Sequence, residues 1–228
     1  MGKKRNNHLL NFGCANGLRK LDNRFFNRQD VVKIARDLIG KILVTCFEKK
    51  LTAGRIVETE AYAGEVDRAS HAFGGRRTKR TEIMYQHAGT SYVYLCYGIH
   101  HLFNIVTNKA EIPHAILIRA LEPLSGIETM LSRTGKKSLD YSLTRGPGNL
   151  SRALGLSVTH TGKSLFDDEI YVADDGFVAR KANIITTTRV GVDYAGKDAF
   201  LPYRFFLAGN SYVSSPVKKT KHKMASVE

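Results

Sequence analysis

The chain has 228 residues, of which 43% are hydrophobic and 25% charged, values typical of a globular domain that buries a sizeable core without disulfides. Its 35 Lys and Arg residues exceed its 21 Asp and Glu residues, and the net charge of +14 favours a polyanionic partner, either nucleic acid or an anionic membrane surface. The sequence has no apolar run long enough to span a membrane, no secretory signal, and no zinc, P-loop or dinucleotide-binding motif, which argues against those classes.

The two ends of the chain differ in composition from the part between them. Residues 1–22 are polar, basic and rich in Asn and Gly, and residues 216–228 carry a second run of lysines. We expect a flexible basic arm and a basic tail on either side of a single domain at 23–215. Three widely spaced cysteines fit a reducing compartment better than a disulfide scaffold.

The first regular element expected in the domain is a helix. Apolar residues recur at helical spacing from Val31 to Leu38, and this periodicity predicts a helix over that segment. Asn27 is expected to cap the helix, with Asp30 in its first turn and Gly40 at its end.

Short β-branched or apolar runs separated by turn residues follow this helix, a pattern typical of strands. The predicted strands, in chain order, are 42–47, 54–62, 92–97, 102–107, 115–121, 170–172, 186–192 and 204–207. Hairpins are expected through 48–52 and 98–101, whereas residues 63–90 are expected to be mainly loop because charges and glycines dominate them.

Two further helices are expected between the strands. Ser125 and Glu128 have the spacing of a capping box, which predicts a helix to about residue 133, and a short helix is expected over 149–154. Strands that precede and interleave with segregated helices predict an α+β fold rather than a wound βαβ sheet.

The segment 54–62, GRIVETEAY, combines two carboxylates and a phenol with an otherwise apolar strand. Because strand side chains alternate between faces, one face is expected to hold Ile56, Glu58, Glu60 and Tyr62, and the other Val57, Thr59 and Ala61. One interpretation is an exposed face with solvated acids, since burying unpaired carboxylates is costly. The other is a general acid or base at the end of a strand, supported by the tyrosine.

Three tyrosines within six residues make the 92–97 strand unusual. Tyr92 and Tyr94 are expected to share a face, whereas Tyr97 falls on the other face beside the turn at Gly98. An aromatic side chain at a hairpin tip suits a wedge or a stacking platform for nucleic acid. The alternative is a half-buried strand whose tyrosines pack as phenylalanines would.

Basic residues mark two further places. Arg119 lies inside the apolar strand 115–121, where it needs an anion or several acceptors, and its partner is either structural, a substrate or a catalytic carboxylate. The loop 74–80, GGRRTKR, is a candidate phosphate clamp, with a plain solubility patch as the alternative. His71 and Asn104 indicate little when they are considered alone.

Four segments occur in an order and spacing that point to one family. They are GRIVETEAY at 54–62, HAFGGR at 71–76, YVYLCYG at 92–98 and LIRALEP at 117–123, with shorter matches at 145–147, 189–191 and 204–205. Together, over roughly residues 25–215, they resemble the alkyladenine (3-methyladenine) DNA glycosylase family, the type that includes the mammalian enzyme.

The resemblance implies an α+β domain with a curved, mainly antiparallel sheet, surrounding helices and a β-hairpin that enters the DNA minor groove. It implies a monofunctional DNA N-glycosylase of base excision repair, which flips an alkylated or deaminated purine out of duplex DNA and hydrolyses the bond between base and sugar. No metal or other cofactor is implied. The expected partner is damaged double-stranded DNA, bound by a monomer without a membrane, in the bacterial cytoplasm (nucleoid) or the eukaryotic nucleus.

The resemblance also implies the residues that carry the reaction. Glu60 matches the carboxylate that positions and deprotonates the attacking water, and Arg119 matches the arginine near that water. We expect these two groups to pair, which would keep Glu60 ionised and explain an arginine in an apolar strand. No lysine matches a position from which it could form a Schiff base, so no lyase activity is expected.

Five more residues match positions that hold the base and the DNA. Tyr62 and Tyr94 match aromatic residues that sandwich the flipped base, and His71 matches a third wall that donates a hydrogen bond. Asn104 matches an amide that disfavours undamaged guanine. Tyr97 matches the residue that enters the minor groove and fills the gap left by the flipped nucleotide.

The DNA-facing surface leaves some points open. Arg76 and Arg80 are expected to contact phosphates. Ile99 and His100 stand where the mammalian enzyme has bulkier apolar or aromatic groups, so the order of preferred lesions is not predicted.

Two other functions are alternatives to a DNA glycosylase. One is a non-catalytic nucleic-acid-binding module, which would not need Glu60, and the other is an RNA- or tRNA-binding domain attached to transferase chemistry.

Overall fold

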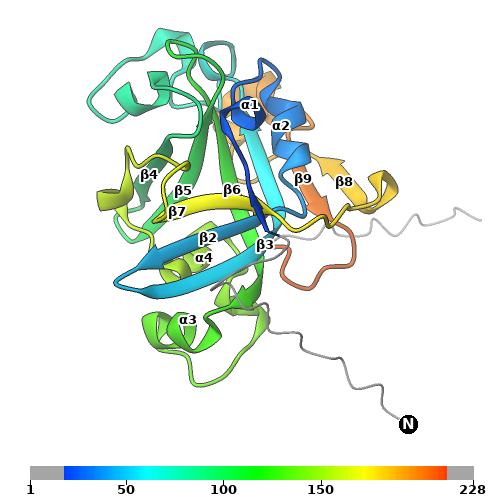
Figure 1. Cartoon of the computed structure of the whole chain (residues 1–228). Coiled ribbons are helices and arrows are strands. Elements are labelled where there is room, and N and C mark those ends of the chain that lie inside the picture. Colours follow the sequence, from blue (N-terminus) through cyan, green and yellow to red (C-terminus); the bar gives the residue numbers. More distant parts are fainter. Residues whose placement is uncertain (1–17, 215–228) are drawn as a thin grey trace, which may run out of the picture.

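Short β-branched and apolar runs pair into one antiparallel sheet in the computed structural model, which describes residues 18–214 (Figure 1). The strands are β1 (Arg19–Lys20), β2 (Ile42–Phe47), β3 (Lys50–Tyr62), β4 (Ser91–Cys96), β5 (His100–Thr107), β6 (His114–Ser125), β7 (Ile170–Asp174), β8 (Ile184–Thr187) and β9 (Arg204–Leu207). Their order is β1-β7-β2-β3-β6-β5-β4. Strand β9 pairs with β3 beyond the end of β2, and β8 pairs with β9.

Helices surround this sheet in the described part of the chain, and the predicted α+β class is confirmed. The α-helices are α1 (Asn23–Phe26), α2 (Val31–Asp37), α3 (Ile127–Thr134) and α4 (Pro147–Leu154). Short 3₁₀ helices lie at Gly64–Val66, Phe73–Gly75, Glu82–Tyr85, Tyr141–Leu143, Val158–His160, Lys181–Asn183 and Asp193–Phe200. Figure 1 shows α2 beside β3 and β9, and α3 at the far end of the long β3–β6 pair.

Two predicted helix starts are wrong, although the helices themselves are present. Asp30 caps α2 by accepting a hydrogen bond from the Lys33 N–H at 2.9 Å, whereas Asn27 closes the preceding helix α1. Ser125 does not cap α3, because β6 continues to Ser125 and Gly126 precedes the helix at φ 71°. A Cβ at Gly126 would collide with the Leu51 carbonyl, so this left-handed turn requires glycine.

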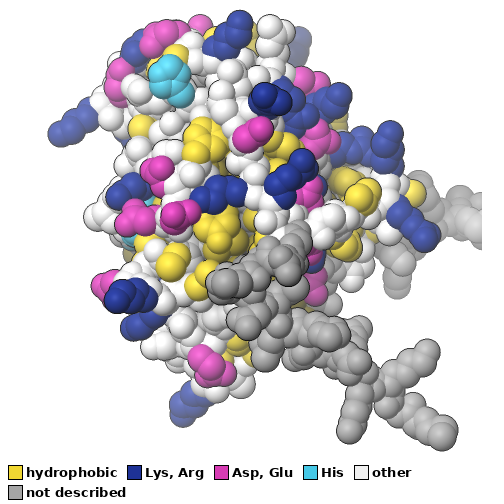
Figure 2. Space-filling model, in the orientation of Figure 1, with side chains coloured by type: hydrophobic (Ala, Val, Ile, Leu, Met, Phe, Trp, Pro, Cys, Tyr) yellow, Lys and Arg dark blue, Asp and Glu magenta, His cyan; other side chains and the backbone are white. Residues whose placement is uncertain are grey.

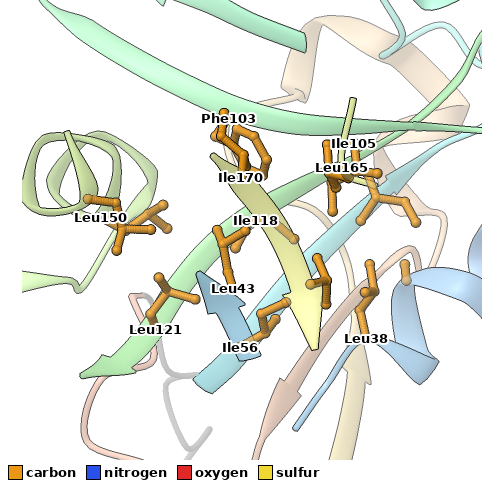
Figure 3. Packing of buried hydrophobic residues seen from close by; sticks show 14 of the residues in the cluster. Leu38, Leu43, Ile56, Phe103, Ile105, Ile118, Leu121, Leu150, Leu165 and Ile170 are labelled. Atoms are coloured by element: carbon orange, nitrogen blue, oxygen red, sulfur yellow. The ribbon is translucent and has the colours of Figure 1, made fainter. Parts of the chain in front are cut away.

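The main hydrophobic core lies on one face of the sheet. Figure 3 shows Ile56, Ile118 and Leu121 of the central strands packing between Leu38, at the end of α2, and Leu150 of α4. Alternate residues of β4, β5 and β6 face this core and are Val93, Phe103, Ile105, Ile116 and Ile118. Their neighbours in each strand point to the opposite face, which is therefore free to build a pocket.

Strands β3 and β6 change register where the charged residues lie. The aligned pairs are Ile56–Leu121, Glu58–Ala120 and Thr59–Ile118. Val57 of β3 and Arg119 of β6 therefore have no aligned partner in the other strand. The extra residue Val57 puts Ile56 into the core and Glu58 on the opposite face, so the prediction that these two share a face is wrong.

Several predicted boundaries also change. The 48–52 connection is shorter, because β3 begins at Lys50 after a turn at Glu48 and Lys49, which have φ values of 51° and 63°. The predicted strand 186–192 is wrong beyond Thr187, where β8 ends. Strand β4 ends at Cys96, and Tyr97 lies in the turn at φ 50°.

The ends of the domain differ slightly from the prediction. Arg19 and Lys20 form β1 against β7, and Leu21 joins the core, so the last residues of the predicted 1–22 arm belong to the domain. The rest of that arm and the basic tail lie outside the described residues. Among the described residues, no helix is both long and apolar enough to cross a membrane.

Candidate active site

The sheet face opposite the main core carries a pocket with an empty volume of about 330 Å³. Its lining residues are Tyr62, Ala69, Ser70, His71, Met84, Tyr92, Tyr94, Asn104, Ala115 and Tyr194. All four residues predicted to bind a base are therefore brought together. The pocket opens into a groove of about 1330 Å³ that also reaches Tyr97, Arg80 and Arg119. A small pocket beside a long groove suits one ring system attached to a larger polymer.

Aromatic rings form much of the pocket wall. The ring centroids of Tyr92 and Tyr94 lie 5.5 Å apart, and His71 packs edge-on against Tyr94 with centroids 4.7 Å apart. Burial raises the pKa of Tyr92 to about 12 and raises that of Tyr94 as well, so both phenols are neutral. Of the two interpretations of this strand, buried packing describes Tyr92, whereas Tyr94 also lines the open groove.

Glu60 is fully buried beside the pocket and receives three donors. The Tyr62 hydroxyl donates to Oε2 at 2.9 Å, Arg119 Nη1 lies 3.2 Å from the same oxygen, and the Val190 N–H donates to Oε1 at 2.8 Å. Burial and the neighbouring Glu60 carboxylate raise the pKa of Tyr62, which keeps this phenol a donor. The expected pair of Glu60 with Arg119 is present, and the interpretation as a solvated face is wrong.

The three donors line the groove, whereas the Glu60 carboxylate lies behind them. Tyr62 also lines the pocket, so its ring faces the pocket while its hydroxyl reaches the carboxylate. The Glu60 carboxylate is therefore separated from the space that a flat ring would occupy by a single side chain, that of Tyr62. A carboxylate in this position is suited to accept a proton from a water molecule in the groove.

Arg119 also contacts a second buried carboxylate, which belongs to Glu58. Its Nε donates to Glu58 Oε1 at 2.9 Å, and Arg204 Nε donates to the same oxygen at 2.8 Å. The backbone N–H of Ser214 donates to Glu58 Oε2 at 2.6 Å. Burial alone would lower the pKa of Arg119, but Glu60 and Glu58 raise it, so the arginine stays charged.

Another buried ion pair supports the pocket from behind. Arg189 donates to both oxygens of Asp67, at 2.5 and 2.8 Å, and both side chains are almost completely buried. The Arg189 guanidinium lies over the Tyr62 ring, 4.9 Å from its centroid. Strand β8 ends at Thr187, and Arg189 then points inward to contact Asp67. The N–H of the next residue, Val190, donates to Glu60. This contact explains why the predicted strand over 186–192 stops early.

Asn104 lines the pocket, and its amide nitrogen is hydrogen-bonded to the protein backbone. Nδ2 donates to the backbone carbonyls of Tyr92 and Leu102, both at 3.2 Å. Only the amide nitrogen can donate to carbonyls, so these bonds fix the orientation of the side chain. Its oxygen is the atom left to meet a ligand, and an acceptor there can distinguish rings by the groups on their edges.

His71 is half-buried and uncharged at neutral pH. Its Nδ1 lies 2.8 Å from the Tyr92 hydroxyl, while burial and the charges of Arg80 and Arg76 lower its pKa to about 4. We expect this depressed pKa to make the protein lose stability as the pH falls from about 6.5 to about 4, by about 3 kcal/mol in all.

Urea unfolding of the wild type and of His71→Gln across that pH range measures this effect. The difference in unfolding free energy between the two proteins should shrink or reverse as the pH falls, because only the wild type must protonate this site on unfolding. His87→Gln, at an exposed histidine, is the control. A constant difference between His71→Gln and the wild type would contradict the expectation.

The basic loop is not uniform. Arg77 pairs with Glu82 at 2.8 Å and with Glu111, and its guanidinium lies over Tyr85, so this residue holds the loop together. Arg80 lies over the Tyr94 ring, 5.8 Å from its centroid, and lines the groove. Figure 2 shows that basic side chains also gather along the side of α2 and β8, so the positive charge extends beyond this loop.

Sequence reasoning missed parts of the site that depend on distant contacts. Asp67 was one charge among many in a predicted loop, and its partner Arg189 lies 122 residues away. Tyr194 lines both pocket and groove, and its hydroxyl donates to the Ala69 carbonyl at 3.2 Å, but nothing around it in the sequence marks it. In the sequence, Glu58 stands out only as the second carboxylate of its strand, and its contacts with Arg119 and Arg204 join it to distant segments.

The described residues contain no cluster of His, Cys, Asp and Glu side chains arranged to hold a metal ion, and Cys46 and Cys96 are free. The site consists instead of an aromatic pocket, a buried carboxylate held by an arginine, and a groove with basic residues at its rim. These features fit an enzyme that acts on one flat ring of a larger polyanion.

Comparison with known proteins specifies the family. Residues 24–211 match the sequence model of the methylpurine-DNA glycosylases. Relatives from Desulfitobacterium hafniense and from Clostridium perfringens strain 13 are 42% and 39% identical, over 86% of this chain and 99% and 98% of theirs. A relative from Chlamydia pneumoniae is 40% identical over 82% of this chain and 95% of its own. All three carry the provisional name of a 3-methyladenine DNA glycosylase. The chain belongs to the methylpurine-DNA glycosylase family, and is thus a DNA glycosylase, a hydrolase of DNA repair.

Proposed function

We propose that this protein is a monofunctional N-glycosylase that flips alkylated or deaminated purines out of duplex DNA and hydrolyses the bond between base and sugar. The observation that carries the proposal is the hydrogen bond between Tyr62 and Glu60. It joins a wall of the aromatic pocket to a buried carboxylate, so a base stacked on Tyr62 would bring its glycosidic bond close to a general base. The product is an abasic site.

The pocket walls account for the choice of substrate. An alkylated purine such as 3-methyladenine carries positive charge, and the faces of Tyr62 and Tyr94 attract a flat cation. The oxygen of Asn104 would repel a purine edge that presents an acceptor and would accept a hydrogen bond from an exocyclic amine. Hydrogen bonding at this atom therefore does not account for the expected discrimination against undamaged guanine, which would have to come from the shape of the pocket. A base that is damaged or poorly paired is also the easiest to extrude from the duplex.

Glu60 supplies the chemistry. A water molecule in the groove would displace one of the donors that now cover the carboxylate, and Glu60 would accept its proton as the water attacks the sugar carbon. The sugar gains oxocarbenium character as the base departs, and the negative charge of Glu60 stabilises it. Arg119 holds the carboxylate in place at 3.2 Å. The lining residues of pocket and groove include no lysine, so no Schiff base is expected to form there.

The pocket also suggests an order of substrates. The pKa of His71 is lowered to about 4, while those of the tyrosines Tyr62, Tyr92 and Tyr94 are raised. None of these four groups is a strong proton donor at pH 7. Cationic 3-methyladenine and 7-methylguanine need no proton to leave, so we propose that they are released faster than neutral hypoxanthine.

The test is an excision assay on duplexes that each contain one of these lesions or ethenoadenine. We expect free base and a strand that breaks only after alkali, with the cationic bases released first. Strand cleavage without alkali would contradict the monofunctional mechanism. Binding of lesion duplexes with no base release would contradict catalysis altogether and favour a non-catalytic binding module.

Tyr97 is proposed to fill the gap that the flipped nucleotide leaves. It stands at the tip of the β4–β5 hairpin, 91% exposed, where no core contact explains an aromatic ring. Tyr97→Ser should weaken binding to lesion duplexes about 10- to 100-fold, the usual value of one stacked ring, and leave the melting temperature unchanged. Fluorescence anisotropy measures the binding. Val178→Ser, at another exposed apolar residue, is the matched control, and equal affinities of the two variants would contradict the proposed role.

Arg80 and Arg76 are proposed to contact DNA phosphates. Arg80 lines the groove, whereas Arg77 in the same loop is already neutralised by two glutamates. Arg80→Gln should therefore reduce the slope of log K against log salt by about 0.9, the value for one lost phosphate contact. Arg77→Gln should alter the slope less. Equal slopes for Arg80→Gln and the wild type would place Arg80 away from the DNA backbone.

A further inference from the structure

Glu58 is a buried carboxylate that the proposed reaction does not use. Its side chain is completely inaccessible and lines neither the pocket nor the groove. Its two oxygens accept hydrogen bonds from Arg119, Arg204 and both the N–H and the hydroxyl of Ser214, at 2.6 to 2.9 Å. Donors already occupy both oxygens of this carboxylate, and a group this costly to bury needs a reason.

Given the proposed function, we propose that Glu58 is a positioning residue for the reaction: it orients the Arg119 guanidinium toward Glu60 and balances the positive charge behind that carboxylate. Glu58 acts through Arg119 and does not touch the substrate.

The geometry of Arg119 supports the orienting role. Its Nε is bound to Glu58 at 2.9 Å while its Nη1 lies 3.2 Å from Glu60. A guanidinium is rigid and planar, so fixing Nε also fixes the direction in which Nη1 points. The third nitrogen, Nη2, donates to the Ser214 hydroxyl at 3.3 Å, and that hydroxyl in turn donates to Glu58.

Strand pairing constrains the backbone of Arg119 less than that of its neighbours. Residues on either side of Arg119 have aligned partners in β3, but Arg119 itself falls at the register shift. A side chain at such a position is aimed by its contacts more than by regular pairing. Glu58 and Ser214 supply those contacts. Without them, Glu60 would be the remaining described partner of Arg119, and it could not position the arginine independently.

Charge balance provides a second reason. Two carboxylates, Glu58 and Glu60, face two arginines, Arg119 and Arg204, in this buried cluster. Other charged or titratable groups that act on Glu60 are Tyr62 on its own strand, Tyr94 on β4, and Arg189 and Tyr194 from the segment after β8. Without Glu58, the two arginines would face the single carboxylate of Glu60, so Glu58 keeps the charges of this cluster balanced.

The test is Glu58→Gln in the full-length protein, assayed by single-turnover release of 7-methylguanine from duplex DNA at saturating enzyme. We expect the rate to fall about tenfold, as when a reacting group is slightly misplaced. The acid limb of the pH–rate profile should move to lower pH, because a neighbouring negative charge has been removed. Affinity for the lesion duplex should not change.

A merely structural Glu58 would lower the melting temperature without moving the acid limb, and that result would overturn the proposal. Asp175→Asn is the matched control, because Asp175 is a carboxylate bound by Arg55 at 2.7 Å outside the pocket and groove. It should leave both the rate and the limb unchanged.

Ser214→Ala keeps the test decisive if Glu58→Gln does not fold. It removes one hydroxyl that contacts both Arg119 and Glu58 but leaves every charge in place. The rate should fall about threefold with the acid limb unmoved, since only the orientation of Arg119 is disturbed. An unchanged rate would overturn the proposal. A wild-type protein that releases no base would instead refute the proposed function.

Discussion

Glu60→Gln is expected to slow the release of alkylated purines from duplex DNA by at least about 100-fold, the usual contribution of a positioned general base. The amide has nearly the shape of the carboxylate but cannot accept a proton from water. It also lacks the negative charge that would stabilise an oxocarbenium-like sugar. Because the pocket walls are untouched, the variant should still bind lesion duplexes.

The surroundings of Glu60 set the cost of this substitution. Oε1 accepts from the Val190 N–H and Oε2 accepts from the Tyr62 hydroxyl and faces Arg119. Whichever oxygen becomes an amide nitrogen, one donor then meets another donor, so we expect a loss of about 1–3 kcal/mol of stability. The excision rate must therefore be compared at a temperature where melting curves show both proteins folded.

Glu60→Asp separates the lost charge from the disturbed contacts. It keeps the carboxylate but withdraws it by one methylene, so its rate should lie between those of the wild type and Glu60→Gln. Near wild-type release by folded Glu60→Gln would remove Glu60 from the reaction and leave the pocket as a binding site.

Local patterns were sufficient to predict most elements and part of the site. Strands such as 42–47 and 204–207 are β-branched or aromatic runs whose side chains favour a pleated surface in any setting. The resemblance named Glu60 and Arg119 from different strands, and the structure places them 3.2 Å apart. Tyr62, which shares the face of Glu60, follows from simple alternation because no register shift falls between the two.

The rest depended on contacts between distant segments. Alternation failed at Ile56 because one extra residue in β3 reverses the faces, and no local signal in the strand announces it. The strand expected over 186–192 ended early because Arg189 finds a buried anion 122 residues away. The capping prediction at Ser125 failed for a different reason. Ser125 is the last residue of β6, so its backbone belongs to the strand and Gly126 precedes the helix instead.

Asp67→Asn is expected to have the largest effect on stability, a loss of about 3–5 kcal/mol, because it leaves Arg189 buried without its anion. Each oxygen of Asp67 accepts two hydrogen bonds, one from Arg189 and one from the backbone, at Ala63 or Ala69. An amide nitrogen at either place would face two donors. For a domain of this size the melting temperature should fall by roughly 10 °C.

Excision should fall together with stability in this variant, and the reason lies in what Arg189 holds. It backs the Tyr62 ring and precedes the N–H that Val190 donates to Glu60, so loosening Arg189 disturbs the base platform and the catalytic carboxylate at once. Asp168→Asn, which removes a fully exposed partner of Lys20, should change stability little and leave excision intact. If calorimetry finds equal losses for the two variants, the Asp67–Arg189 pair does not anchor the site. If Asp67→Asn is destabilised yet excises normally when folded, the pair anchors the fold while Tyr62 and Glu60 keep their places without it.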